Sequence, residues 1–359
     1  MAENPFKPDW VSCPGETMAD ILEERSCSST EFAQRMGYSA KQVSELLKGR
    51  TTISFETACR LELVLGATAD FWIAREAQYS GTVAHAQNKV KFTGQESWLS
   101  ELPLKDMRRY GWLAPDLSVS DPVTACLRFF GVADVQAWRA TYHNLLEMAA
   151  FRTSPTFHSQ PGALAAWMRQ GEIESAAIDC KPWHTAGFQR ALSEIRPLTR
   201  KRDPRLFIPE LTRCCAEHGV AVVIVRAPEG CRASGATRFL SEKKALLLLS
   251  FRYLSDDHFW FTFFHEAAHL LLHSKKALFL EGEKVSSVEE DEANEFAAHV
   301  LVPSEFQDKL EHLPVDRHDI RNFARMIGVS PGIILGQLQH LGRARRNQLD
   351  HLKVRFSWE

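Results

Sequence analysis

Apolar residues recur at intervals of three and four along much of the chain, which is the spacing of amphipathic helices. Over residues 1–80 this pattern is punctuated by Gly and Ser and predicts a bundle of short helices. From 81 to 204 the periodicity is weaker, and polar stretches separate the helical patterns near 123–130, 135–148 and 163–169. We therefore expect a helical connecting region there, to which no chemistry can be assigned.

The pattern changes beyond Pro204. Three short strand-forming stretches now appear between longer helical patterns. The clearest are the apolar runs at 220–225 and 244–251, which are typical of buried strands. Helical patterns cover 208–218, 259–273, 291–301 and 318–341. The chain as a whole is thus predicted to be α+β and predominantly helical. Its small sheet is expected within residues 205–359, which follow the helical bundle of residues 1–80 and the connecting region 81–204.

Composition narrows the class of protein. The chain of 359 residues is long enough for two or three domains, and its 45% apolar and 25% charged residues are globular values. A formal net charge of -2 argues against a wholly basic nucleic-acid coat protein, so DNA binding would have to be local. The eight cysteines form no CxxC pair, and we interpret them as reduced thiols. Without a leader pattern or an apolar run of about 20 residues, we expect a cytoplasmic protein with no membrane contact.

Residues 31–47 have the spacing of a helix-turn-helix. One short helix is predicted over 31–36, Gly37 and Tyr38 can form the turn, and Ser39 can cap a second helix from Ala40. The second helix of such a motif enters a major groove. The candidate DNA-contacting residues are Ser39, Lys41, Gln42, Ser44, Lys48 and Arg50. Of these, Lys41, Lys48 and Arg50 are expected to contact phosphates, and Gln42 is the leading candidate to read a base. The alternative is a helical bundle whose polar residues are only solvated.

The wider segment adds a family resemblance. The stretch SELLKGRTTISFETACRLELVLG followed by ADFW resembles the HigA branch of the XRE family of helix-turn-helix regulators, over roughly residues 11–79. The resemblance implies a homodimer that binds a short palindromic operator.

A second motif, His265-Glu266-Ala267-Ala268-His269, has the spacing of a zinc peptidase site. Residues four apart share one face of a helix, so His265 and His269 can bind one cation. Glu266 can then act as general base toward a water molecule. The helix is apolar on nearly all sides, and burying these polar groups would be costly unless they bind something; core histidines with ordinary hydrogen bonds are the alternative. His273 lies ~12 Å of helix rise from His265 and is expected to form hydrogen bonds or to pack.

A carboxylate from another helix is the expected third ligand, because no metzincin-type third His follows His269. The segment 286–303 supplies four acids near its start, Glu289, Glu290, Asp291 and Glu292. Ala293, Ala297 and Leu301 define its inward face, and Glu290 falls within that sector whereas Glu292 points away with Glu295 and His299. Glu290 is therefore the predicted ligand, and Asn294, one turn later, is expected to hydrogen-bond a ligand side chain.

The stretches FWFTFFHEAAHLLLH and EEDEANEFAAHVLVP together resemble the ImmA/IrrE family of metallopeptidases, over roughly residues 205–359. The resemblance implies a gluzincin-like zinc peptidase domain, one Zn²⁺ ion (or Mn²⁺), and cleavage of a specific protein. That substrate is expected to be a repressor encoded nearby, in stress, phage or toxin-antitoxin regulation. The helical tail 323–338 resembles a second helix-turn-helix, but residues 331–335 carry no cation for phosphate, so we expect it to cap this domain.

Two other functions remain open at this point. The chain could be an antitoxin-type transcription factor whose peptidase-like domain only binds a partner, although Glu266 favours the enzyme. A metal or redox sensor built on Cys214 and Cys215 is the third hypothesis, and buried small hydrophobic residues are the commoner reason for such a pair.

Overall fold

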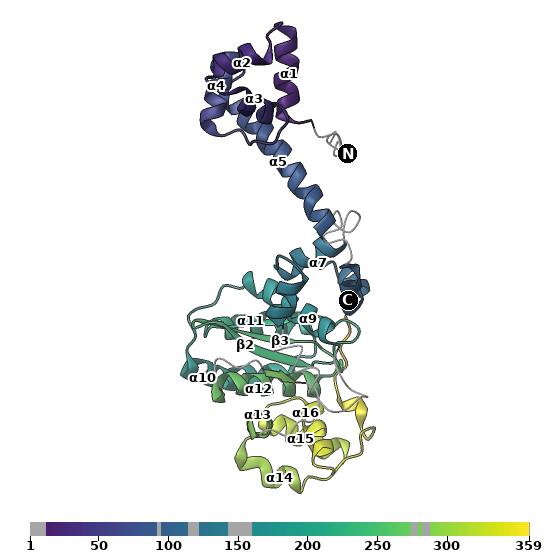
Figure 1. Ribbon diagram of the computed structural model, residues 1–359. Coiled ribbons are helices and arrows are strands. Elements are labelled where there is room, and N and C mark those ends of the chain that lie inside the picture. Colours follow the sequence, from purple (N-terminus) through teal and green to yellow (C-terminus); the bar gives the residue numbers. More distant parts are fainter. Residues whose placement is uncertain are drawn as a thin grey trace. The chain divides into compact units, whose positions relative to one another are not determined.

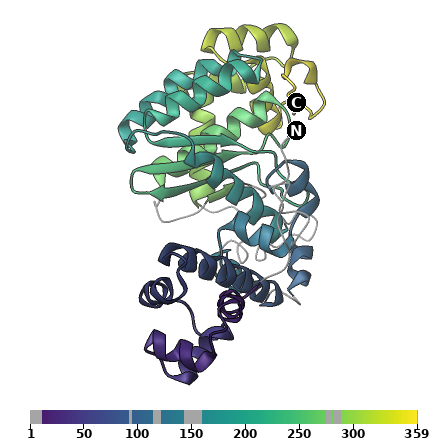
Figure 2. The same ribbon diagram turned by 90° about the horizontal axis from the view of Figure 1, so that it is seen from above.

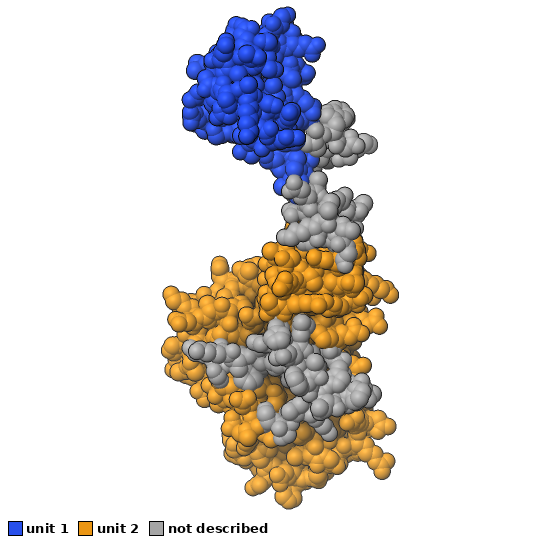
Figure 3. Space-filling model, in the orientation of Figure 1, with its two compact units in different colours: residues 1–94 blue, residues 95–359 orange. Residues whose placement is uncertain are grey.

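The computed structural model describes residues 12–91, 95–113, 122–142, 160–273, 279–281 and 288–358. The chain divides into two compact units, residues 1–94 and residues 95–359 (Figures 1 and 3). The region 81–204, which the sequence suggests is a connection, is therefore shared between the two units. Its larger part, residues 95–204, belongs to the second unit.

The first unit is a bundle of helices around one core, drawn in purple to blue in Figures 1 and 2. Met18, Phe32, Val43, Leu61 and Trp72 are buried in this core and come from five different helices. The helices are α1 (Pro14–Glu24), α2 (Ser29–Met36), α3 (Ala40–Leu47), α4 (Phe55–Leu65) and α5 (Ala69–Lys91).

Local signals set the boundaries of these helices. Ser28, Ser39 and Ser54 each accept a hydrogen bond from a backbone N–H in the first turn of the helix that follows. Gly37 ends α2 with φ 67°, a left-handed conformation that favours glycine. The turn between α2 and α3 is thus specified by the sequence itself.

The second unit is built around a four-stranded sheet in the order β1-β3-β2-β4 (Figure 1). The strands are β1 (Val220–Ile224), β2 (Gly235–Ser241), β3 (Lys244–Leu249) and β4 (Phe279–Glu281). β1 pairs with β3 in parallel, while β2 pairs antiparallel with both β3 and β4. The small sheet expected from the sequence is present.

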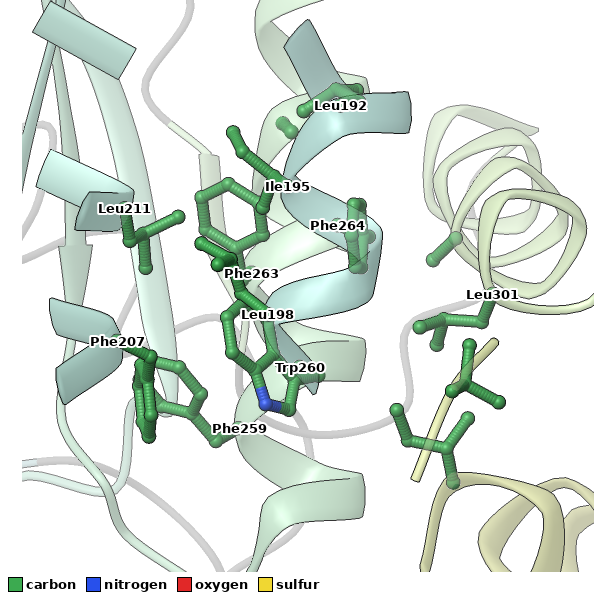
Figure 4. Packing of buried hydrophobic residues seen from close by; sticks show 14 of the residues in the cluster. Leu192, Ile195, Leu198, Phe207, Leu211, Phe259, Trp260, Phe263, Phe264 and Leu301 are labelled. Carbon is green, nitrogen blue, oxygen red and sulfur yellow. The ribbon is translucent and has the colours of Figure 1, made fainter. Parts of the chain in front are cut away.

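Helices cover both faces of this sheet. α9 (Pro161–Ala176) packs on β1 and β3, where Gly171 allows close approach to Leu248. On the other face α12 (Asp256–Leu272) and α11 (Pro204–Ala216) share a core with Val222 and Leu247. Figure 4 shows this core around Trp260. Side chains that alternate along a strand point to opposite faces, so these strands are apolar on both sides.

The remaining described helices of the second unit lie before the sheet or form its C-terminal cap. Before the sheet are η1 (Glu96–Glu101), α6 (Leu104–Arg109), α7 (Pro122–Phe130), α10 (Thr185–Ile195) and η2 (Arg196–Arg200). After it come α13 (Val288–Leu301), η3 (Ser304–Phe306), α14 (Gln307–Glu311), α15 (Arg317–Ile327), α16 (Pro331–His340) and η4 (Asp350–Leu352). The part of the expected helical pattern 135–148 beyond residue 142 lies outside the described residues.

The tail resembles a second helix-turn-helix but is used for packing. Gly328 separates α15 from α16 with φ 81°. Ile333, Ile334 and Leu335 of α16 are buried, and α16 packs on α12. The tail thus packs against the helix that carries His265 and His269.

Candidate metal centre and helix-turn-helix surface

His265 and His269 lie one turn apart on α12 and face the same point. Each residue is only 1% exposed, and their Nε2 atoms are 3.0 Å apart. The helix is long, apolar and free of Pro and Gly, so it presents both imidazoles from a rigid element.

Glu290 reaches the same point from α13. Its Oε2 lies 3.3 Å from His265 Nε2, and its Oε1 lies 3.8 Å from His269 Nε2. The side chains of Ala293 and Ala297 are buried and small, which allows α13 to pack closely on α12. The structure thus brings together the three residues selected as ligands from the sequence.

The three side chains suit a divalent metal ion. Their ligand atoms all lie within 4.8 Å of one another. Burial, together with the neighbouring His265, lowers the pKa of His269 to about 3, so its imidazole is neutral at neutral pH, as coordination requires. Two imidazole nitrogens and one carboxylate oxygen are the protein ligands of many catalytic zinc sites. His273 is not part of this group.

The remaining nitrogens of the two imidazoles have partners of their own. His265 Nδ1 lies 3.1 Å from Asn294 Oδ1, and His269 Nδ1 lies 2.9 Å from His273 Nδ1. Such contacts fix the ring orientation and the tautomer of a metal ligand. The structure therefore places Asn294 and His273 within hydrogen-bonding distance of the two candidate ligands.

Glu292 lies closer to the metal centre than its position on the helix predicts. It was expected to point away from the site, and its side chain is 54% exposed. Its Oε2 nevertheless lies 3.1 Å from His273 Nε2. The reason is that His273 sits just past the end of α12, where a long side chain on the flank of α13 can reach it.

Glu266 is completely buried beside the two histidines, and the backbone of β2 lies against it. A Cβ added to Gly235 would lie 2.6 Å from both Cγ and Oε1 of Glu266. Only glycine therefore fits at this position of the strand. The signal for Gly235 in the sequence is weak: an isolated glycine in a strand pattern can indicate a close backbone approach, but it does not name the partner.

The helix-turn-helix surface lies on α3. Lys41, Gln42, Lys48 and Arg50 are exposed, and Ser44 is half-buried. Arg50 Nη1 lies 3.6 Å from Glu45 Oε1, so part of its charge is offset locally. Lys41, Lys48 and Arg50 thus lie at the surface of the first unit.

Ser39 and Gln42 are tied to each other. Gln42 N donates to Ser39 Oγ over 3.2 Å, while Ser39 N and Ser39 Oγ donate to Gln42 Oε1 over 2.8 and 2.9 Å. This is a capping box, which stabilises the start of α3. Gln42 thus has a structural role beside the base-reading role expected of it, and its side chain is exposed.

The cysteine pair has the character of core residues. Cys215 is buried, and burial raises the pKa of its thiol well above the ordinary value. Burial also raises the pKa of the neighbouring Cys214 thiol. Thiols in this state are poor nucleophiles and poor metal ligands at neutral pH. Separately, no helix among the described residues combines the length and apolar character needed to cross a bilayer.

Comparison with known proteins matches both units. Residues 18–72 match the helix-turn-helix family, and residues 215–338 match the IrrE N-terminal-like domain of a peptidase family. The chain is 30% identical over 77 residues to the uncharacterized HTH-type transcriptional regulator YddM of Escherichia coli, a match that covers 21% of this chain and 80% of that protein. A crystal structure described as an antidote protein of a plasmid maintenance system from Nostoc punctiforme is 27% identical, with a TM-score of 0.22, over 23% of this chain and 90% of the other.

The helix-turn-helix match coincides with the capped turn between α2 and α3, and the peptidase-family match contains the histidines of α12 and the carboxylate of α13. The first unit is thus the DNA-binding unit of the molecule. The chain belongs to the HTH-type transcriptional regulators and joins to this DNA-binding unit a metallopeptidase-like domain of the IrrE type.

Proposed function

We propose that the second unit is a zinc-dependent endopeptidase that cleaves one specific protein. The observation that supports this most is the convergence of His265, His269 and Glu290 on one point beside the buried Glu266. A site that only stabilises the fold would gain nothing from a buried general base, and its fourth position would normally hold another Cys or His.

Each residue has a role in this proposal. The two imidazoles and the Glu290 carboxylate hold the ion, which when bound supplies Lewis acidity to the scissile carbonyl. Glu266 accepts a proton from the attacking water and delivers it to the leaving amine. Asn294 and His273 keep the imidazoles oriented, and the apolar surroundings of α12 exclude bulk water.

The first unit supports a regulatory setting for this activity. A helix-turn-helix regulator acts as a dimer on two half-sites when its operator is palindromic. Phe55, Leu63 and Phe71 of the first unit are large apolar side chains with exposed fractions of 69%, 86% and 40%, which favours burial against a second copy. We therefore include a homodimer bound to operator DNA in the proposal. The substrate we propose is a repressor encoded nearby, cleaved in response to stress, phage or mobile elements.

The test uses the full-length chain loaded with zinc and incubated with the proteins encoded by its neighbouring genes. Intact-mass analysis should show cleavage of one of them at a single site. The Glu266→Gln variant should keep its zinc, because both histidines and Glu290 remain, and should leave every candidate uncleaved. Cleavage by this variant at the rate of the natural chain would contradict the proposal. Zinc binding with a stable partner complex and no cleavage would instead support the partner-binding function.

A further inference from the structure

The second unit contains a large cavity that the proposed function does not use. It has a volume of about 930 Å³ and is lined by residues of α11 and β1, by residues at the end of α9, and by residues 355–358 of the C-terminal segment, which comprises residues 354–358. None of the metal-centre residues lines it. Its walls are mainly apolar and include Ile208, Val222, Ile224, Phe251, Phe356 and Trp358. A cavity of this size with mainly apolar walls is typical of a small-molecule site.

Three arginines and two acids also line the cavity. The arginines are Arg202, Arg205 and Arg355, all of them exposed, and the acids are Glu174 and Asp203. Arg205 pairs with Asp203 over 2.9 Å and Arg355 pairs with Asp350 over 2.5 Å. Arg202 forms no ion pair within the described part of the chain. Guanidinium groups beside an apolar cavity are suited to an apolar molecule that carries a carboxylate.

The walls of the cavity are joined to the start of α12. Phe251 stacks on Phe259 of α12 with ring centroids 4.5 Å apart, and Phe356 lies 5.1 Å from Phe251. The backbone of Phe251 is left-handed, with φ 50°, and that of Leu254 has φ 51°. Such conformations are strained for residues other than glycine and often occur at ligand sites and switch regions.

The C-terminal segment is also hydrogen-bonded to this helix start. Phe356 N donates to Leu254 O over 2.8 Å, and Asp256 N donates to Val354 O over 3.0 Å. Val354 N in turn donates to Asp256 Oδ1 over 2.9 Å. A molecule that contacts Phe356 and Trp358 therefore touches a segment that anchors the helix carrying His265 and His269.

We propose that this cavity binds a small effector consisting of an apolar chain or ring with one carboxylate, and that binding orders the C-terminal segment against α12. The apolar part contacts Phe251, Phe356 and Trp358, and the carboxylate pairs with Arg202 at the edge of the cavity. The site is independent of the proposed peptidase activity, since none of its lining residues is a metal ligand or the general base.

The experiment is calorimetric titration of the full-length chain with decanoate, decan-1-ol and decyltrimethylammonium. We expect one decanoate per chain, with the alcohol and the cation binding at least about tenfold more weakly because only the carboxylate pairs with a guanidinium. Arg202→Gln should weaken decanoate binding about tenfold, and Thr212→Trp should abolish it by filling the cavity. The matched control is Arg213→Gln, which changes a neighbouring exposed residue of α11 that does not line the cavity.

Hydrogen exchange tests the coupling. Decanoate should slow exchange of the Val354 and Phe356 amides in the natural chain and in Glu266→Gln alike, so the result does not depend on proteolysis. Equal affinity for decan-1-ol, unchanged binding in Arg202→Gln, or no binding at millimolar decanoate would overturn the proposal. Preferential binding of extended acidic peptides over decanoate would also overturn it. Arg202→Gln changes only an exposed side chain, so the test stands even if Thr212→Trp fails to fold.

Discussion

Gly235 and Glu266 are in contact because β2 runs directly over the face of α12 that carries the general base. A Cβ on residue 235 would lie 2.6 Å from Oε1 of the carboxylate and 2.7 Å from Thr262 Cγ2. The strand therefore packs against the Glu266 side chain and limits the positions that it can adopt. The position of the Glu266 side chain therefore depends on how the sheet packs against α12, and not only on the sequence motif of α12.

Gly235→Ala should accordingly abolish proteolysis while leaving the metal in place. The added methyl group must push Glu266 from its position, whereas His265 and His269 are not touched. Overpacking of this kind costs roughly 1–3 kcal/mol of unfolding free energy. The measurements are zinc content, thermal unfolding and cleavage of the substrate. Full cleavage by a folded, zinc-loaded variant would show that Glu266 has more room than this structure gives it.

Glu290→Gln should weaken zinc binding, because the neutral amide replaces the carboxylate that faces both imidazoles. We expect an affinity at least about tenfold lower, measured by competition with a chelator. Glu289→Gln is the matched control, since Glu289 is an exposed acid of the same helical turn. Glu292 is less suitable because it contacts His273. If Glu289→Gln had the larger effect, α13 would be rotated relative to this structure.

The two roles of Gln42 can be separated by one substitution. In Gln42→Glu the carboxylate can still accept from Ser39 and suits a helix N-terminus, so the unfolding free energy should change little. DNA binding should be lost because an acid faces the phosphates and the amide donor is gone. Gln42→Ala should in addition cost roughly 0.5 kcal/mol of stability, because the bonds from Ser39 to Gln42 Oε1 are lost while Ser39 still caps the helix. Binding is measured by fluorescence anisotropy on the upstream operator at several salt concentrations. Unchanged operator affinity in Gln42→Glu would remove Gln42 from the interface.

Local sequence patterns predicted the parts of the molecule that depend on helix geometry. His265, His269, Glu290 and Asn294 come together because spacing along two helices determines which side chains share a face. The same logic was available for Gln42, since Ser39 and a glutamine three residues later form the capping-box pattern.

Contacts between elements distant in sequence could not be predicted in this way. The approach of Gly235 to Glu266 depends on how β2 packs over α12. The role of residues 95–204 was also hidden, because α9 is buried on most sides and its sequence lacks the one-sided pattern of a surface helix. Its packing on β1 and β3 depends on a sheet whose strands come later in the chain.

The last prediction concerns Asp256, which is 1% exposed at the start of α12. Ser330 Oγ donates to its Oδ2 over 2.6 Å, and Val354 N donates to its Oδ1, so this carboxyl joins α12 to the C-terminal cap. Burial raises its pKa from 3.8 to about 6, with a smaller contribution from the charge of Asp257, although the hydrogen bonds oppose the shift.

Because the pKa is raised in the folded state, the folded chain binds the proton more tightly than the unfolded chain. The resulting contribution to stability is fully present below pH 3.8 and is lost as the pH rises through about 6. Asp256→Asn cannot titrate at this position. Between pH 4.5 and pH 7.5 the natural chain should therefore lose about 2 kcal/mol of unfolding free energy relative to the variant, which is the linkage expected for this pKa shift. Urea unfolding of both proteins at the two pH values measures the difference, and the other titrating groups cancel because both proteins carry them. Parallel pH profiles for the two proteins would mean that Asp256 stays ionised in the folded chain, with the hydrogen bonds from Ser330 and Val354 outweighing the effect of burial.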